Sequence, residues 1–122
     1  MKAEDAEKLM LALVSAYVWV ATADEGVEVV EYTHFFPSIV KSPFATHFDE
    51  DDLRHTFKDM VRLFEDDFDA ALKLTRQRIQ AYKNEPIMAE EIIRMARAAV
   101  VGDGQLKAPE ESVLGEIESA LG

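Results

Sequence analysis

Residues 9–31 read LMLALVSAYVWVATADEGVEVVE, and this stretch decides the fold. Its first fifteen residues, Leu9 to Ala23, carry no charge, and the acidic turn Asp24-Glu25-Gly26 follows directly. If the uncharged part is helical, apolar side chains lie on every side of it, so it cannot sit at the protein surface. The sequence therefore predicts a central buried helix, with Trp19 in the core, followed by a tight turn and the start of a second helix.

The same arrangement returns more weakly near the other end of the chain. An apolar segment again runs into a turn, Gly-Asp-Gly, and a Pro-Glu-Glu helix start follows. Asp103 lies 79 residues after Asp24, and Glu110 lies 79 residues after Glu31. Other positions in this register agree only in chemical class. The pattern indicates a weak internal pseudo-repeat, in which the hairpin of helices 1 and 2 is echoed by the hairpin of helices 5 and 6.

Length and charge narrow the possible functions. A chain of 122 residues is long enough to bury one core, which predicts a single domain over residues 1–122. The net charge of −11 repels phosphate backbones and anionic lipids, so we expect neither nucleic acid binding nor membrane insertion. Cations or a basic protein partner are favoured, and the oligomeric state stays open. The absence of cysteine excludes disulfides and thiolate metal sites and suits the cytoplasm.

The apolar run also has to be tested as a targeting segment. The residues before it are mixed in charge, with Glu4, Asp5 and Glu7 outweighing Lys2 and Lys8, whereas a signal peptide begins with positive charge. Fifteen uncharged residues also fall short of the ~20 that a membrane span requires. We therefore interpret the run as a core helix.

Apolar residues recur at helical spacing along the whole chain, and no segment alternates with the period of a strand. The first helix is expected to end near Ala23, and the second to begin near Val27. Pro37 should kink or stop this second helix close to Phe36, because proline lacks a backbone donor and clashes with the preceding turn. A third helix is expected from about residue 50 to 64. Asp49 should be its N-cap.

Three more helices complete the all-α prediction of about six helices. Asp66 is expected to cap the fourth, whose inner face is marked by Phe68, Leu72, Thr75, Ile79 and Tyr82. The fifth should run from about Pro86 to Val101 and end at the glycine turn. Pro109 suits the first turn of the sixth helix.

The repeated acids are the strongest candidates for chemistry. In each hairpin, an Asp in the turn and a Glu seven residues later can approach each other and offer oxygen ligands to Ca²⁺ or Mg²⁺. The predicted metal ligands are Asp24, Glu31, Asp103 and Glu110. The alternative is structural: the two Asp residues hydrogen-bond their turns, and the two Glu residues stabilise helix N-termini by about 0.3–1 kcal/mol each.

The residues around these acids resemble a known family. Residues 98–111, AAVVGDGQLKAPEE, are similar to the helix, Asp-Gly turn and Pro-Glu-Glu helix start of tellurite-resistance TerB-like proteins, and residues 23–27, ADEGV, with Glu31 resemble the first copy of that motif. The resemblance implies an all-helical domain, divalent cation binding at the same four acids, a bacterial role in resistance to tellurite and related stress, and no enzymatic activity. Related domains also accompany the J domains of co-chaperones. Ala108 stands where the family usually has a Ser or Thr cap.

The remaining polar groups suggest no further site. Glu31 and His34 form an E-x-x-H pair, but a di-iron bundle needs a second copy, which this chain lacks. His47 and His55 should be solvated, and the acid clusters 49–52 and 65–69 should cap helices. No nucleophile with its base and no phosphate-binding glycine loop is present, so we expect no enzyme. Two hypotheses remain: a TerB-like cation-binding stress protein, or a metal-free interaction module whose acidic surface binds a basic partner.

Overall fold

A computed structural model describes residues 1–25, 30–100 and 107–122, and these residues form six α-helices and no strand. The helices are α1 (Ala3–Glu25), α2 (Tyr32–Ile39), α3 (Glu50–Asp66), α4 (Phe68–Gln80), α5 (Pro86–Ala98) and α6 (Ala108–Leu121), and a 3₁₀ turn, η2 (Ala45–His47), precedes α3. The all-α prediction is confirmed.

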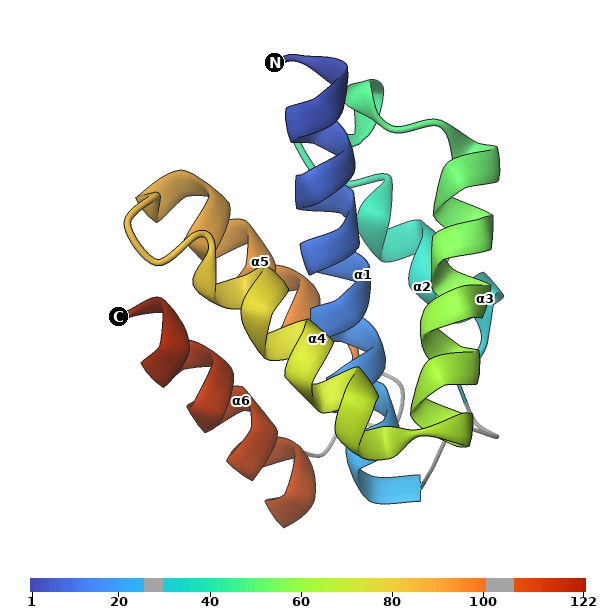
Figure 1. Ribbon diagram of the computed structural model, residues 1–122, viewed down its shortest axis with the longest axis vertical. Helices are drawn as coiled ribbons and strands as arrows, with labels where there is room; N and C mark the ends of the chain where they lie inside the picture. The colour runs from blue at the N-terminus through green and yellow to red at the C-terminus, as the bar shows by residue number, and fades with distance from the viewer. Residues whose placement is uncertain (26–29, 101–106) are drawn as a thin grey trace.

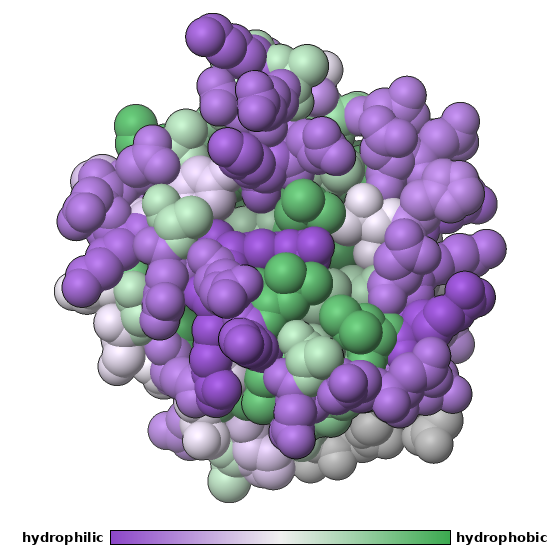
Figure 2. Space-filling view, in the orientation of Figure 1, coloured by the Kyte–Doolittle hydropathy of each residue, from purple (hydrophilic) through white to green (hydrophobic). Residues whose placement is uncertain are grey.

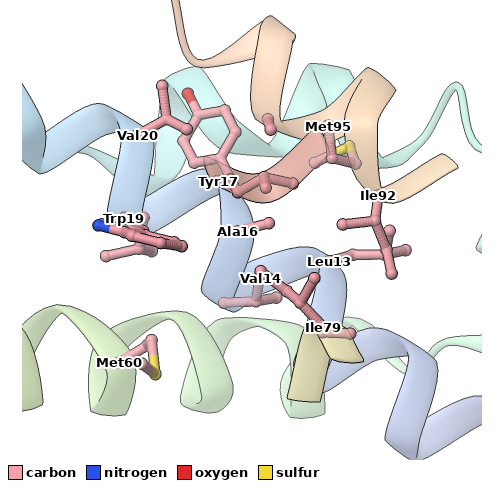
Figure 3. Packing of buried hydrophobic residues seen from close by; sticks show 14 of the residues in the cluster. Leu13, Val14, Ala16, Tyr17, Trp19, Val20, Met60, Ile79, Ile92 and Met95 are labelled. Atoms are coloured by element: carbon pink, nitrogen blue, oxygen red, sulfur yellow. The ribbon is translucent and has the colours of Figure 1, made fainter. Parts of the chain in front are cut away.

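Helix α1 is the central element, as the sequence predicts. It runs through the middle of the molecule and packs against α3, α4, α5 and α6 (Figure 1). Its side chains lie among Met60 of α3, Ile79 of α4 and Met95 of α5, so they are covered on several sides (Figure 3). Leu13 is completely buried, and Trp19 is only 5% exposed. A helix that is apolar all round is stable only with such a cover.

Helix α1 also has the length and composition of a membrane span. Its segment Ala3–Ala23 has 21 residues, because the helix extends into the charged residues before the uncharged run, and the most apolar part of this segment has a mean hydropathy of 1.3. However, 72% of its most apolar window is buried inside the fold. In this structure α1 packs as the core helix of the domain.

The boundaries of α1 and α2 differ from the prediction. Helix α1 continues through Glu25, two residues beyond Ala23, and α2 begins at Tyr32 instead of near Val27, which lies outside the described residues. Pro37 does not stop α2, which runs on to Ile39. Phe35 and Ile39 are both completely buried, so packing outweighs the hydrogen bond that proline removes.

Helices α3 and α4 meet at a different aspartate from the one expected. Asp49 caps α3 as predicted, since its carboxylate accepts hydrogen bonds from the backbone N–H groups of Asp51 and Asp52. Asp66 is the last residue of α3, and Asp67 caps α4 by accepting a bond from Ala70 N–H at 3.1 Å. In a run of acids, sequence alone does not show which one leaves the helical conformation.

One prediction for the inner face of α4, that it includes Phe68, is wrong. Phe68 is 49% exposed, because it follows the cap directly and covers Phe64 edge-on from outside, with ring centroids 5.6 Å apart. The deeper positions Thr75, Ile79 and Tyr82 are buried as expected.

Helix α6 closes the other side of the core. It packs on α1, α4 and α5, and Leu114 and Ile117 are buried against them. Two ion pairs hold its outer face, Arg76–Glu116 at 3.0 Å to α4 and Arg97–Glu118 at 2.7 Å to α5. Helix α5 ends at Ala98, earlier than the predicted end near Val101, because Ala99 is its C-cap and Ala99 and Val100 already form a turn.

The surface is mostly hydrophilic. Figure 2 shows polar side chains over most of one face, with a smaller group of hydrophobic side chains near its middle. The acids at positions 50–52, in the first turn of α3, are exposed, where they complement the helix dipole.

Candidate functional site

The structure describes the side chains of two of the four predicted ligands. Asp24 lies in the last turn of α1, but its side chain is outside the described part of the structure, and so is the whole of Asp103. Glu31 and Glu110 are described. The end of α1 and the start of α6 lie at the same end of the molecule (Figure 1).

Glu110 is a buried carboxylate at the start of α6. It is the third residue of this helix and only 6% exposed. Its Oε1 atom accepts a hydrogen bond from Lys107 N–H at 3.2 Å, which is one half of a capping box. Within residues 1–25, 30–100 and 107–122, no second hydrogen bond or ion pair reaches this carboxylate. Among the described residues only one of its two oxygens is hydrogen-bonded, and carboxylate oxygen is a ligand that hard divalent cations prefer.

Glu31 sits differently at the start of α2. It is the N-cap residue, yet its side chain accepts no hydrogen bond from a backbone N–H group of the first turn. Its Oε2 atom lies 3.9 Å from His34 Nε2 and accepts a weak hydrogen bond from Thr33 Oγ1 at 3.5 Å. The side chains of Glu31 and His34 are 61% and 72% exposed. The E-x-x-H pair is therefore a solvated contact.

The two copies of the motif differ in where the helix begins. Glu31 precedes the first residue of α2, whereas Glu110 lies inside α6, whose first residue is Ala108. In the register of the repeat, α6 thus starts three residues earlier than α2. The N-cap of α6 is Lys107, so Ala108 does not occupy the capping position that the resemblance implied.

The sequence model of the tellurite resistance protein TerB family matches residues 10–122, nearly the whole chain. The chain belongs to the TerB family. No curated protein and no solved structure gives a significant match. The family is associated with tellurite resistance, and its all-helical fold agrees with the six helices described above.

Two of the three histidines of this TerB-family domain lie together at another place. His47 and His55 line a hollow of about 320 Å³ with Glu7, Asp49 and Asp52, between the first turns of α1, η2 and α3. Asp49 already caps α3, and both histidines are exposed, as predicted. Across the described residues, no three His, Asp or Glu side chains are arranged to hold a metal ion.

Two buried polar contacts could not be foreseen from the sequence. Arg78 of α4 donates to Ser15 Oγ at 2.9 Å and to Met60 Sδ at 3.4 Å, and burial lowers the pKa of its guanidinium. Arg94 forms an ion pair with the buried Glu91 and donates to the Ser38 carbonyl at 3.1 Å. The spacing of Glu91 and Arg94 was the only local signal, because the other partners are distant in sequence.

Proposed function

We propose that this TerB-family domain is a tellurite-resistance stress protein that binds Ca²⁺ or Mg²⁺ at the start of α6, through Glu110 and Asp103. The observation that carries the proposal is the burial of the Glu110 carboxylate, which has a single described hydrogen bond. Asp24 and Glu31 form the corresponding second position, which we expect to be weaker because Glu31 is exposed.

The chemistry of the donor set suits hard divalent cations. Carboxylate and turn carbonyl oxygens are the ligands that Ca²⁺ and Mg²⁺ prefer, and Mg²⁺ usually keeps several waters. A cation beside Glu110 supplies the charge that a buried carboxylate lacks, while Lys107 N–H keeps Oε1 in place. With only two carboxylates per position, water completes the coordination, so we expect weak affinity.

In this proposal the protein acts by binding and not by catalysis, in the cytoplasm of a bacterium. The alternative is a metal-free interaction module of the co-chaperone-associated or adaptor type, whose acidic surface binds a basic partner. The exposed acids at the first turn of α3 and the charge of −11 support that alternative.

Thermal unfolding tests the metal proposal. Ca²⁺ or Mg²⁺ should raise the unfolding midpoint above the value in Na⁺ at equal ionic strength, because a ligand of the folded state stabilises it by mass action. The Na⁺ control is required because any salt screens repulsion between acids. Asp103→Asn with Glu110→Gln should abolish most of the divalent response. The glutamine keeps an oxygen that can accept the Lys107 N–H bond, so the cap and the ligand role are separated.

Glu111→Gln is the matched control, since Glu111 is an exposed acid in the same first turn of α6. It removes one of the two negative charges that the double variant removes, from the same turn, and should leave the divalent response intact. If Na⁺ reproduces the whole stabilisation, or Glu111→Gln and the double variant respond alike, the metal site is refuted. The acids would then be assigned to stabilising helix N-termini and to binding a basic partner.

A further inference from the structure

A second concave region lies on α3, far in sequence from the acidic turns. Residues 30–32 and the outer side of α3 enclose a groove of about 500 Å³, which we call the α3 groove. Its apolar lining is Val30, Phe57 and Val61, all packed at the edge of the core. Figure 1 shows α2 alongside α3 at this side of the molecule. This volume is within the range of about 300–1,000 Å³ that is typical of small-molecule sites.

Tyr32 forms one wall of this groove. Its ring lies edge-on to Phe57, with centroids 5.6 Å apart, and the guanidinium of Arg54 lies over it at 5.0 Å. Its hydroxyl is buried and has no hydrogen-bond partner among the described residues. Because the hydroxyl is not accessible in this structure, Tyr32 contributes its ring to the apolar wall of the groove.

A row of cations follows the same side of α3. Arg54, Lys58 and Arg62 recur every four residues, which places them about 6 Å apart along the helix axis. Arg54 is paired with Glu50, whereas Lys58 and Arg62 are exposed and make no ion pair with any described residue. Both line the groove. Two unpaired cations beside an apolar hollow stand out in a chain with a net charge of −11.

The charge of the side chains that line the groove changes sign along α3. Glu65 and Asp66 line its other end, so an anionic group is favoured only beside Lys58 and Arg62.

We propose that the α3 groove binds an amphipathic carboxylic acid, a small molecule with one carboxylate and an apolar body. The carboxylate pairs with Lys58 and Arg62, and the apolar body covers Val30 and Val61. This site is independent of the cation proposal.

Titration of the isotope-labelled protein with decanoate and with decanol, below their aggregation limits, tests this site by amide NMR. Decanoate should give saturable shifts confined to residues 30–36 and 54–66, and decanol, which lacks the charge, should bind at least tenfold more weakly. Lys58→Glu with Arg62→Glu should weaken decanoate binding at least tenfold and leave decanol binding unchanged. Lys73→Glu is the matched control, because Lys73 is an exposed cation on α4 outside the groove, and should leave decanoate binding within twofold.

Tyr32→Phe should fold normally, since the hydroxyl has no partner among the described residues to lose, and should leave decanoate binding within twofold, because the ring that lines the groove is kept. Equal binding of decanoate and decanol would overturn the proposal. So would equal losses in the groove variant and Lys73→Glu, or shifts spread over the whole surface. Binding of an acidic peptide at α3 without binding of decanoate would also overturn it, since the groove would then be a protein-docking surface.

Discussion

The starts of α2 and α6 carry the same acid in the repeat, but the two helices are held in different ways. At α6 the acid, Glu110, is buried and caps the helix, and two ion pairs fix the outer face behind it. At α2 the acid, Glu31, faces water, and the next residue, Tyr32, anchors the turn among aromatic rings. The same acid of the repeat is therefore buried at one helix start and exposed at the other, because the two positions are not covered by equivalent helices.

The largest effect should come from the aromatic anchor of α2. Phe35 is completely buried, with its ring centroid 5.1 Å from that of Tyr17 and 5.0 Å from that of Phe57. Phe35→Ala should lower the free energy of unfolding by about 3–5 kcal/mol, because it removes buried area and leaves a cavity. Phe68→Ala, at a half-exposed ring, should cost less than about 1.5 kcal/mol in the same urea titrations. Similar costs would mean that α2 is not held by its aromatic residues.

The second effect is a difference in stability between variants that lack Glu110 and variants that lack Glu31. Glu110→Ala should cost about 1–2 kcal/mol of stability, because Lys107 N–H loses its acceptor at a buried helix start. Glu31→Ala should change stability by no more than about 0.5 kcal/mol, as expected for an exposed side chain without a cap bond. Chemical denaturation of both variants in metal-free buffer measures the difference. Equal losses of stability in the two variants would show that Glu110 and Glu31 do not differ in their structural role.

A smaller gain is expected at the N-cap of α2. Glu31 occupies this position, but its side chain accepts no hydrogen bond from a backbone N–H group of the first turn. Glu31→Ser places a short hydroxyl there and should stabilise the protein by about 0.5–1 kcal/mol. Thermal unfolding measures this change. A loss of stability would indicate that Glu31 has a structural partner in its present form.

These differences also show what the sequence could and could not predict. The uncharged run predicted the central helix correctly, because fifteen residues without charge have only one stable place in a small domain. Asp49 was recognised as a cap because it is the first acid of its cluster and directly precedes an amphipathic helix. The start of α2 was missed by several residues, because its position depends on Phe35 and Ile39 reaching the core. The burial of Glu110 depends on how α6 packs, which no local pattern encodes.

A further effect is the response to alkaline pH. Burial is the main cause that raises the pKa of Tyr32, followed by Glu50, while Arg54 opposes the rise, and burial raises the pKa of Tyr82 to about 12. A raised pKa in the folded state means that these groups stabilise the fold fully below about pH 10, the ordinary tyrosine pKa. That contribution should disappear as the pH rises through the folded-state pKa, about 12 for Tyr82.

Ultraviolet absorbance of tyrosinate should therefore rise at higher pH in the native protein than in urea. Tyr82→Phe should remove part of the alkaline loss of stability, and Tyr32→Phe a smaller part. Titration of both native tyrosines at the same pH as in urea would contradict their burial.

Paramagnetic broadening by Mn²⁺ compares the two copies most directly, since Mn²⁺ shares the carboxylate and carbonyl preferences of Mg²⁺ and Ca²⁺. With small additions of Mn²⁺ to the labelled protein, the amide signals of Lys107 and Glu110 should broaden before those of Glu31 and Tyr32, and excess Mg²⁺ should reverse the effect. Glu110→Gln should abolish this selective broadening. Broadening that is strongest at Glu31, or at the exposed acids 50–52, would contradict the account that the buried acid of α6 holds the cation.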